Sequence, residues 1–130
     1  MQTPEPCGPT RRVLVVDDDA DMAETLAMLL RLMGHEARCV TRSTDAIDVA
    51  KSLRPNIAFV DLGMPKIDGY ELARMFRETP ELRETALVAV SGHGRPEDRA
   101  RSRHAGFDAH VVKPVDSPLM ESILAQFDSR

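Results

Sequence analysis

Short apolar runs recur along the chain, and most of them end at a charged or polar residue. Each run is four or five residues long, a common length for a strand. The runs are mostly continuous Val, Leu, Ile and Ala, without regular polar alternation. Continuous apolar strands are typical of sheets that are covered on both faces. The predicted strands are residues 13–16, 36–40, 56–60, 86–90 and 109–112.

The segments between these runs are predicted to be helices, most of them with apolar residues three or four positions apart. Gly34, Pro55 and Gly106 stand where three of these segments end, as Gly and Pro commonly do at helix C-termini. At the last helix, Ser117 is the predicted cap and Pro118 the first helical residue. The predicted helices are residues 22–33, 46–53, 70–76, 96–105 and 118–127.

The alternation of five strands with five helices predicts an α/β fold, a parallel sheet with helices on both faces. The 130 residues fit one domain, and we find no internal repeat. Residues 1–11 are rich in proline and predicted to be a disordered lead-in, followed by one folded domain at residues 12–130. In such sheets, ligands bind beyond the carboxyl ends of the strands.

Polar side chains stand at the carboxyl ends of four predicted strands. The first strand ends at three consecutive acids, the third at one acid, the fourth at a serine and the fifth at a lysine. These residues are Asp17, Asp18, Asp19, Asp61, Ser91 and Lys113. Because the carboxyl ends of parallel strands share one edge of a sheet, we expect these side chains to lie close together.

A cluster of acids needs a compensating positive charge. Two carboxylates about 4 Å apart repel by roughly 1 kcal/mol in water and about 4 kcal/mol near a protein surface. Lys113 supplies one charge, and Mg²⁺, which binds carboxylates together with phosphate oxygens, is the natural source of the rest. A carboxylate can also accept a phosphoryl group as a nucleophile. The sequence therefore predicts a magnesium site for phosphoryl transfer, with Lys113 and the Ser91 hydroxyl pairing with phosphoryl oxygens.

Composition excludes several other classes of protein. The net charge of −4 argues against binding to nucleic-acid phosphates, and one Tyr, four Phe and no Trp leave few rings for stacking on bases. No apolar run approaches the roughly 18 residues of a membrane span, and the N-terminus lacks the apolar core of a secretory signal. Cys7 and Cys39 are predicted to be reduced thiols. We therefore expect a cytoplasmic protein with no direct nucleic-acid or membrane binding.

Four segments together carry a family resemblance: VLVVDDD, FVDLGMPKIDG, LVAVSG and VVKPV, in this order and spacing. They resemble the receiver domain of two-component response regulators over about residues 12–127, and the segment at residues 91–116 is most similar to receivers attached to hybrid sensor histidine kinases. The resemblance implies a flavodoxin-like doubly wound sheet of five parallel strands in the order 2-1-3-4-5. It also implies a domain that accepts a phosphoryl group from a histidine kinase or a histidine phosphotransfer protein, as part of a phosphorelay.

The family motifs also imply a role for each matching residue. Asp61 is implied as the phosphoacceptor, with Ser91 and Lys113 as its catalytic partners. Asp17 and Asp18 are implied as ligands of Mg²⁺ or Mn²⁺, together with Asp61 and the backbone carbonyl of Gly63. The Lys113–Pro114 peptide is implied to be cis. Such a domain is not an enzyme in the usual sense, although it can catalyse its own phosphorylation and dephosphorylation.

His110 stands where the family often has a Tyr or Phe that rotates during switching. We expect Ser91 to move towards a phosphorylated Asp61 and His110 to turn inward behind it. The fourth helix and fifth strand then present a changed surface to an unidentified downstream partner. Because His has an unperturbed pKa of about 6.5, this switch is expected to be sensitive to pH.

Two other interpretations compete with a working receiver. Asp17 and Asp19 have the spacing of the nucleophile and second acid of haloacid-dehalogenase-type phosphatases, with Ser91 and Lys113 as candidates for the later motifs. That interpretation leaves Asp61 unexplained, and Asp19, like Asp21, is better suited to the first turn of a helix, where the helix dipole favours an acid. The third interpretation is a degenerate receiver that only docks partners, which the intact acids argue against.

Overall fold

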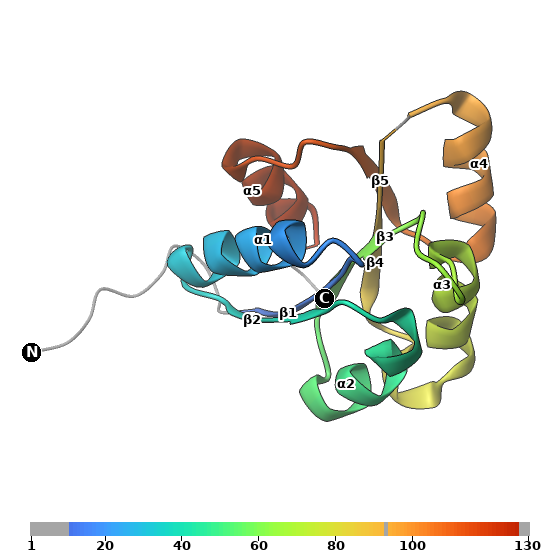
Figure 1. The fold of residues 1–130 in the computed structure, drawn as a ribbon, viewed down its shortest axis with the longest axis horizontal. Helices are drawn as coiled ribbons and strands as arrows, with labels where there is room; N and C mark the ends of the chain where they lie inside the picture. Colours follow the sequence, from blue (N-terminus) through green and yellow to red (C-terminus); the bar gives the residue numbers. More distant parts are fainter. Residues whose placement is uncertain (1–10, 93, 128–130) are drawn as a thin grey trace, which may run out of the picture.

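Five short strands form one parallel sheet in the order β2-β1-β3-β4-β5, as the resemblance implied. This computed structural model describes residues 11–92 and 94–127. The strand register places Val15 between Cys39 and Phe59, so that β1 and β3 lie in the middle of the sheet (Figure 1). The strands are β1 (Arg12–Val16), β2 (Glu36–Val40), β3 (Ile57–Asp61), β4 (Ala86–Ser91) and β5 (Ala109–Val112).

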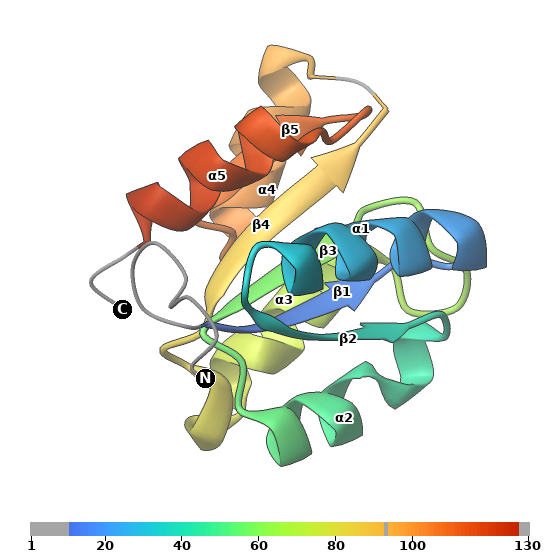
Figure 2. The same cartoon turned by 90° about the vertical axis from the view of Figure 1, so that its left-hand side faces the viewer.

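Helices cover both faces of the sheet, which explains the continuous apolar strands. Helices α1 and α5 pack on one face, and α2, α3 and α4 pack on the other (Figures 1 and 2). Alternate residues of each central strand enter the two cores, so that Leu14 and Val16 face α2 and α3 while Val13 and Val15 face α1 and α5. The helices are α1 (Ala20–Leu32), α2 (Ala46–Leu53), α3 (Gly69–Glu78), α4 (Pro96–Ala105) and α5 (Ser117–Gln126).

The observed strands reach further towards the polar residues than their apolar patterns predicted. Asp61 and Ser91 are the last residues of β3 and β4, and both still belong to the sheet. Two short 3₁₀ helices, at Ser43–Asp45 and Pro80–Leu82, were not predicted, because three residues carry no periodicity to detect.

Two predictions about segment ends need correction. Asp116, not Ser117, caps α5: its Oδ1 accepts the N–H of Leu119 at 3.0 Å, and Ser117 is already helical. Arg11, which we assigned to the lead-in, is buried, and its carbonyl accepts the N–H of Glu36 at 2.9 Å. The folded domain therefore begins at least one residue earlier than predicted. The rest of the predicted lead-in lies outside the described residues.

The remaining local predictions concern peptide geometry, thiols and membrane spans. The Lys113–Pro114 peptide is cis. Cys39 is a free thiol, and Cys7 lies outside the described residues. None of the helices in residues 11–92 and 94–127 is long and apolar enough to cross a bilayer.

Candidate functional site

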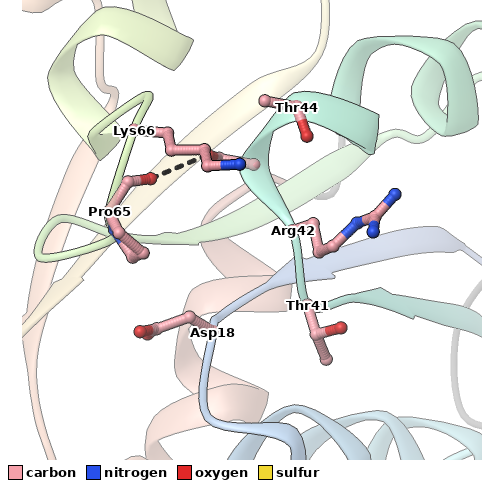
Figure 3. Close-up of a pocket in the computed structure, with 7 residues that line it drawn as sticks. Asp18, Thr41, Arg42, Thr44, Pro65 and Lys66 are labelled. Carbon is pink, nitrogen blue, oxygen red and sulfur yellow. Dashed lines mark hydrogen bonds between the residues drawn. The ribbon is translucent and has the colours of Figure 1, made fainter.

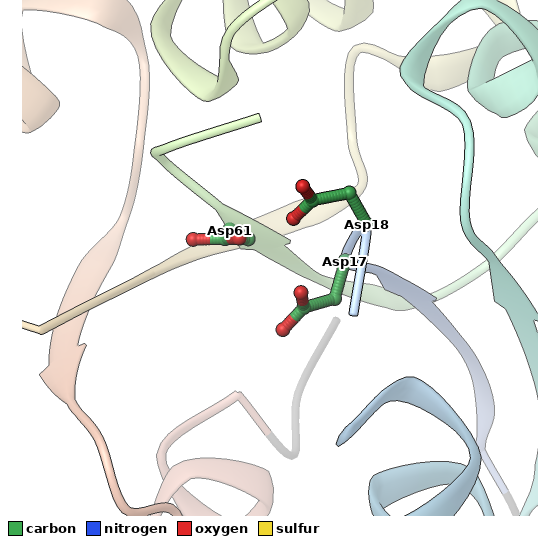
Figure 4. Close-up of side chains that lie close together, drawn as sticks. All are labelled: Asp17, Asp18 and Asp61. Carbon is green, nitrogen blue, oxygen red and sulfur yellow. The ribbon is translucent and has the colours of Figure 1, made fainter. Parts of the chain in front are cut away.

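Three carboxylates converge at the carboxyl edge of the sheet (Figure 4). Asp17 and Asp18 follow β1, and Asp61 ends the neighbouring β3. Each offers an oxygen, and these oxygens lie within 4.8 Å of one another. Asp17 and Asp61 are buried, whereas Asp18 is open to solvent. Acids separated by more than 40 positions in the sequence thus share one cluster.

Lys113 reaches this cluster from the end of β5. Its Nζ lies 3.5 Å from Oδ2 of Asp17 and 3.7 Å from Oδ1 of Asp61. At such distances the ammonium attracts both carboxylates, but one positive charge does not balance three negative ones. The cluster therefore has an excess of negative charge, as the strand ends predicted.

Burial raises the pKa of the Asp61 carboxyl above its usual value. The negative charge of Asp17 and a hydrogen bond with it raise this pKa further, whereas the Gly63 N–H and the Lys113 ammonium act against the rise. The ionised form of Asp61 is thus disfavoured when no further cation is near. A divalent cation between the carboxylates would reverse this penalty, because hard oxygen ligands around a small ion are the usual magnesium environment.

Backbone N–H groups fix the orientation of the two buried carboxylates. Asp17 Oδ1 accepts the N–H of Asp19 at 2.9 Å, and Asp61 Oδ1 accepts the N–H of Gly63 at 3.2 Å. Each bond joins residues two positions apart, so the turn that follows each strand also fixes the orientation of the carboxylate. Gly63 lies directly beside Asp61, while the predicted role of its carbonyl as a metal ligand stays a prediction.

Gly69 has a structural role that the sequence analysis missed. A Cβ atom at this position would lie 2.6 Å from the Asp61 carbonyl oxygen and 2.8 Å from Cα of Leu62. Glycine therefore allows the start of α3 to approach the end of β3. Asp68 caps the same helix, because its Oδ1 accepts the N–H of Glu71 at 2.9 Å. A glycine after an acid predicts only a turn, and the close approach becomes visible once α3 is placed.

Asp19 and Asp21 serve α1. Asp19 is the N-cap of this helix, and its Oδ1 accepts the N–H of Met22 at 3.2 Å. Asp21 lies in the first turn, where a negative charge is favoured by the helix dipole. Of the three consecutive acids, Asp19 therefore has a capping role and is absent from the carboxylate cluster.

Ser91 lies beside Lys113 at the same edge, since the Lys113 N–H donates to the Ser91 carbonyl at 2.8 Å. The Ser91 hydroxyl contacts Nε2 of His110 at 2.7 Å, and Nδ1 of the same ring lies 3.2 Å from the hydroxyl of Ser102. Ser102 was missed by the sequence analysis. Its only signal is its spacing of three positions from Ala105, which places both small residues on one side of the arginine-rich α4, and both are buried.

A hollow of about 320 Å³ opens beside Asp18 (Figure 3). It lies between the segment that follows β2 and the loop from β3 to α3, which are joined where the Ser43 hydroxyl donates to the Pro65 carbonyl at 3.2 Å. The hollow leaves Asp18 accessible from solvent. Its lining residues are Asp18, Thr41, Arg42, Ser43, Thr44, Pro65 and Lys66.

Comparisons with known proteins agree with this architecture. The model of the response regulator receiver domain family matches residues 13–125. A 14.6 kDa protein of the sodA1 3′ region of Leptolyngbya boryana is 30% identical over 115 residues, which cover 88% of each chain. The signal receiver domain of a histidine kinase from Syntrophus aciditrophicus is 28% identical, with a TM-score of 0.81, and the match covers 92% of this chain and 91% of that one.

A further solved structure shares the fold at lower identity. The receiver domain of a sensor histidine kinase from Pseudomonas aeruginosa has a TM-score of 0.83 at 22% identity, and the match covers 94% of this chain and all (100%) of that one. That receiver domain has a magnesium ion coordinated in its active-site cleft.

Proposed function

Because the chain belongs to the response regulator receiver domain family, we propose that it is a signalling domain whose Asp61 accepts a phosphoryl group from a histidine kinase or a histidine phosphotransfer protein. The observation that carries the proposal is the meeting of Asp17, Asp18, Asp61 and Lys113 at one edge of the sheet. Carboxylates that share an unbalanced charge are suited to a divalent metal and to an incoming phosphoryl group.

In the proposed reaction, an oxygen of the Asp61 carboxylate attacks the phosphorus atom. The new O–P bond forms while the P–N bond of the donor's phosphohistidine breaks, and the imidazole nitrogen keeps the electron pair. Lys113 pairs with one phosphoryl oxygen, and the Ser91 hydroxyl donates a hydrogen bond to another. Both groups lie at the edge that holds Asp61.

Asp17, Asp18 and Asp61, with the carbonyl of Gly63, are the proposed ligands of Mg²⁺ or Mn²⁺. The three carboxylates fit such an ion, because their oxygens lie close together and the pKa of Asp61 is raised by burial and by Asp17. When bound, the ion supplies positive charge that neutralises the phosphoryl oxygens. The magnesium in the cleft of the related Pseudomonas aeruginosa receiver supports this choice of metal.

Helix α1 exposes two apolar side chains in its second half. The helix begins three residues after Asp17, whereas Met28 and Leu32, which are exposed by 57% and 78%, lie towards its other end. These side chains are four positions apart, so they lie on one side of the helix. We propose that a protein donor of the phosphoryl group contacts this side of α1 in addition to the edge of the sheet that holds Asp61.

Phosphorylation is proposed to change the surface of α4 and β5. Ser91 of β4 is in contact with His110 of β5, so movement of the Ser91 hydroxyl towards a phosphoryl group must disturb His110. One of the arginines of α4 makes a cation–π contact within the fold, because Cζ of Arg101 lies 4.0 Å from the centroid of the Tyr70 ring in α3. The downstream partner, a place in a larger hybrid kinase and a cytoplasmic location stay predictions.

The phosphatase interpretation is less well supported. Its nucleophile would be Asp17, which is bound by Lys113 and by the N–H of Asp19. Its second acid would be Asp19, whose side chain caps α1. Because the Asp19 carboxylate caps α1 and is absent from the carboxylate cluster, it does not serve as the second acid, and Asp61 remains unexplained. A docking-only receiver is disfavoured because all three acids of the cluster are present and close together.

Mass spectrometry after incubation with a small acyl phosphate or phosphoramidate and Mg²⁺ tests the proposal. We expect a gain of one phosphoryl group on the wild type, and no gain on Asp61→Asn. Asp68→Asn is the matched control, because Asp68 lies in the same loop but caps α3, where Asn caps as well as Asp. A gain that survives in Asp61→Asn contradicts the proposal, and steady hydrolysis that requires Asp17 but not Asp61 favours the phosphatase.

A further inference from the structure

The hollow beside Asp18 is lined by polar groups from two loops (Figure 3). Thr41, Arg42 and Thr44 belong to the segment that follows β2, and Lys66 belongs to the loop between β3 and α3. The Lys66 side chain extends across towards the segment that follows β2, whereas the guanidinium of Arg42 extends away from Asp18. With a volume of about 320 Å³, the hollow is large enough for a small organic group.

The two walls of this hollow are joined to each other. The Ser43 hydroxyl donates to the Pro65 carbonyl at 3.2 Å, and Ser43 is buried, with 5% of its surface exposed. The ring of Pro65 also restricts the backbone of the opposite wall. The hollow is therefore preformed, which lowers the entropic cost of binding a ligand there.

Lys66 has a backbone conformation that favours glycine. Its φ is 68°, in the left-handed region, where a Cβ atom is disfavoured. Its exposed ammonium forms no hydrogen bond or ion pair with any residue in 11–92 or 94–127. No contact of this side chain within the described residues thus explains why a lysine stands at a position suited to glycine. An unfavourable backbone conformation that is retained beside a candidate site is a reason to look for a function.

The direction of phosphoryl transfer places the donor's leaving group outside the carboxylate cluster. In an in-line displacement, the leaving atom lies on the opposite side of phosphorus from the attacking oxygen of Asp61. Asp17 and Asp61 are buried and Asp18 is exposed, so the donor approaches from the solvent side of the cluster. The hollow adjoins Asp18 on this side. Part of the leaving group can therefore occupy the hollow during the reaction.

We propose that this hollow is a subsite for the leaving group of the phosphoryl donor, and that Lys66 forms an ion pair there with a carboxylate of that group. The proposal rests on the proposed function and names a feature of its donor, an acidic side chain next to the phosphohistidine. The P–N bond of the donor breaks, the imidazole nitrogen keeps the electron pair, and the new O–P bond forms at Asp61. Lys66 takes no part in these bond changes and determines specificity only.

Charge gives this subsite a distinct signature. The chain has a net charge of −4, and the carboxylate cluster has an excess of negative charge, so an extra negative charge on a donor is expected to slow association where no cation receives it. An ion pair with Lys66 has the opposite effect. Arg42 adds positive charge at the hollow, although its Nε is already paired with Asp45 at 3.1 Å. The sign of the effect therefore separates the subsite from general repulsion.

Two matched small donors test the subsite. The N-phosphoryl derivatives of imidazolepropionate and imidazolepropionamide have the same P–N bond and nearly the same shape, and they differ by one negative charge. At low ionic strength with Mg²⁺, we expect the carboxylate donor to phosphorylate the wild type about two- to fivefold faster, the effect of one exposed ion pair. The second-order rate constants are measured by mass spectrometry, and the preference is expected to diminish at high salt.

Two charge-removing variants locate the preference. Lys66→Gln is expected to lose it. Lys51→Gln is the matched control, because it removes the same charge from an exposed position of α2 that does not line the hollow, and it is expected to keep the preference.

Lys66→Gly separates the charge from the fold. Glycine suits a φ of 68°, so this variant is expected to unfold at no lower urea concentration than the wild type, while it also loses the preference. A second readout needs no phosphorylation. With Mg²⁺ present, imidazolepropionate is expected to shift the amide resonances of residues 41–44 more than imidazolepropionamide does, and this difference is expected to be absent in Lys66→Gly.

A pair of phosphohistidine peptides tests whether the carboxylate belongs to a protein donor. The two peptides differ only in a Glu or a Gln after the phosphohistidine, and the peptide with Glu is expected to be the faster donor. A preference restricted to the small donors overturns the assignment to an acidic side chain and leaves a small-molecule donor as the source.

The outcomes also separate this subsite from the proposed function. No phosphorylation by any of these donors, in a folded protein, overturns the proposed function and the subsite together. Phosphorylation without a preference for the charged donor overturns the subsite alone. A preference that survives in both Lys66 variants overturns the role of Lys66, and equal amide shifts with the two imidazole compounds overturn the location in the hollow.

Discussion

Asp61 is held in a position where its own charge is unfavourable. It ends a strand whose other residues are apolar and buried, and its carboxylate lies in the same cluster as Asp17 and Asp18. Two weak compensations are available, the Gly63 N–H at 3.2 Å and the Lys113 ammonium at 3.7 Å. Because burial and Asp17 outweigh them, the pKa of Asp61 is raised. The ionised Asp61 thus lowers the stability of the metal-free protein, and the same negative charge favours the binding of a cation.

The raised pKa predicts how replacement of Asp61 changes stability. A carboxyl group whose folded-state pKa is raised stabilises the fold fully when protonated below its unfolded value, and this contribution is lost as pH rises through the folded pKa. Without Mg²⁺ at pH 7, Asp61→Asn is therefore expected to increase the free energy of unfolding, by about 1 kcal/mol on the scale of one carboxylate repulsion.

Urea unfolding followed by circular dichroism measures this change. The advantage of Asp61→Asn over the wild type should shrink as pH falls through the raised pKa of Asp61, because the wild-type side chain then also becomes neutral. Asp68→Asn is the control and should change little in stability at either pH, since Asn caps a helix as well as Asp does. A variant no more stable than the wild type at pH 7 would show that the metal-free cluster is not strained.

The junction of β3 and α3 is the element that positions Asp61. The strand delivers the carboxylate to the edge, and α3 returns so closely that Gly69 lies against the Asp61 carbonyl. Farther along α3, Arg77 donates five hydrogen bonds, to the carbonyls of Arg83, Thr85 and Gly106 and to the Asp108 carboxylate. Helix α3 is thereby fixed at both ends, at the site and at the turn before β5.

Gly69→Ala is expected to disturb this junction. Its Cβ would overlap backbone atoms of Asp61 and Leu62, so α3 or the strand end must move. We expect a loss of about 1–3 kcal/mol in the free energy of unfolding, the usual range for overpacking, which the better helix propensity of Ala offsets only in part. Phosphorylation by the small donor is expected to slow as well, because the Asp61 carboxylate shifts.

Gly92→Ala provides the matched comparison. Gly92 lies near the same edge, but a Cβ there meets nothing within 4 Å. Its unfolding free energy is expected to stay within about 0.5 kcal/mol of the wild type. Equal effects of the two substitutions, in urea unfolding and in the rate of phosphorylation, would contradict the importance of the close approach at Gly69.

The whole molecule is two cores separated by one sheet, with its acidic cluster at one edge. The cores are built from different helices, and the central strands β1 and β3 contribute to both. Asp17 and Asp61 are attached to these two strands, so the most buried part of the fold holds the acids together. The folded protein, unlike the unfolded chain, therefore presents a preformed set of carboxylates to a metal ion.

Mg²⁺ is expected to stabilise the whole domain, because it binds the folded cluster and not the separated acids of the unfolded chain. At a concentration one hundred times the dissociation constant, the free energy of unfolding should rise by about 2.7 kcal/mol. Thermal unfolding with and without Mg²⁺ measures this, and Asp61→Asn should show a smaller rise. A melting temperature that does not respond to millimolar Mg²⁺ would count against the metal site.

Much of the fold was readable from the order of residues. The apolar runs located the central strands β1, β3 and β4, because a strand covered on both faces is apolar along most of its length. The edge strand β2 was also located, although exposed Glu36 and Arg38 interrupt its apolar residues. Their polar ends indicated Asp17, Asp61, Ser91 and Lys113, because parallel strands bring their carboxyl ends to one edge. The strand order came from the resemblance of four motifs to receiver domains, and the structure confirms it.

Other features depend on atoms that are far apart in the chain, and only the tertiary structure decided them. Ser102 became important when α4 packed beside β5 and placed its hydroxyl 3.2 Å from His110. Gly69 became necessary when α3 approached the end of β3. Sequence patterns record which side chains are buried or capped locally, because those preferences act over a few residues. Contacts between distant segments arise only when packing fixes their separation to within an ångström, and no local pattern encodes that distance.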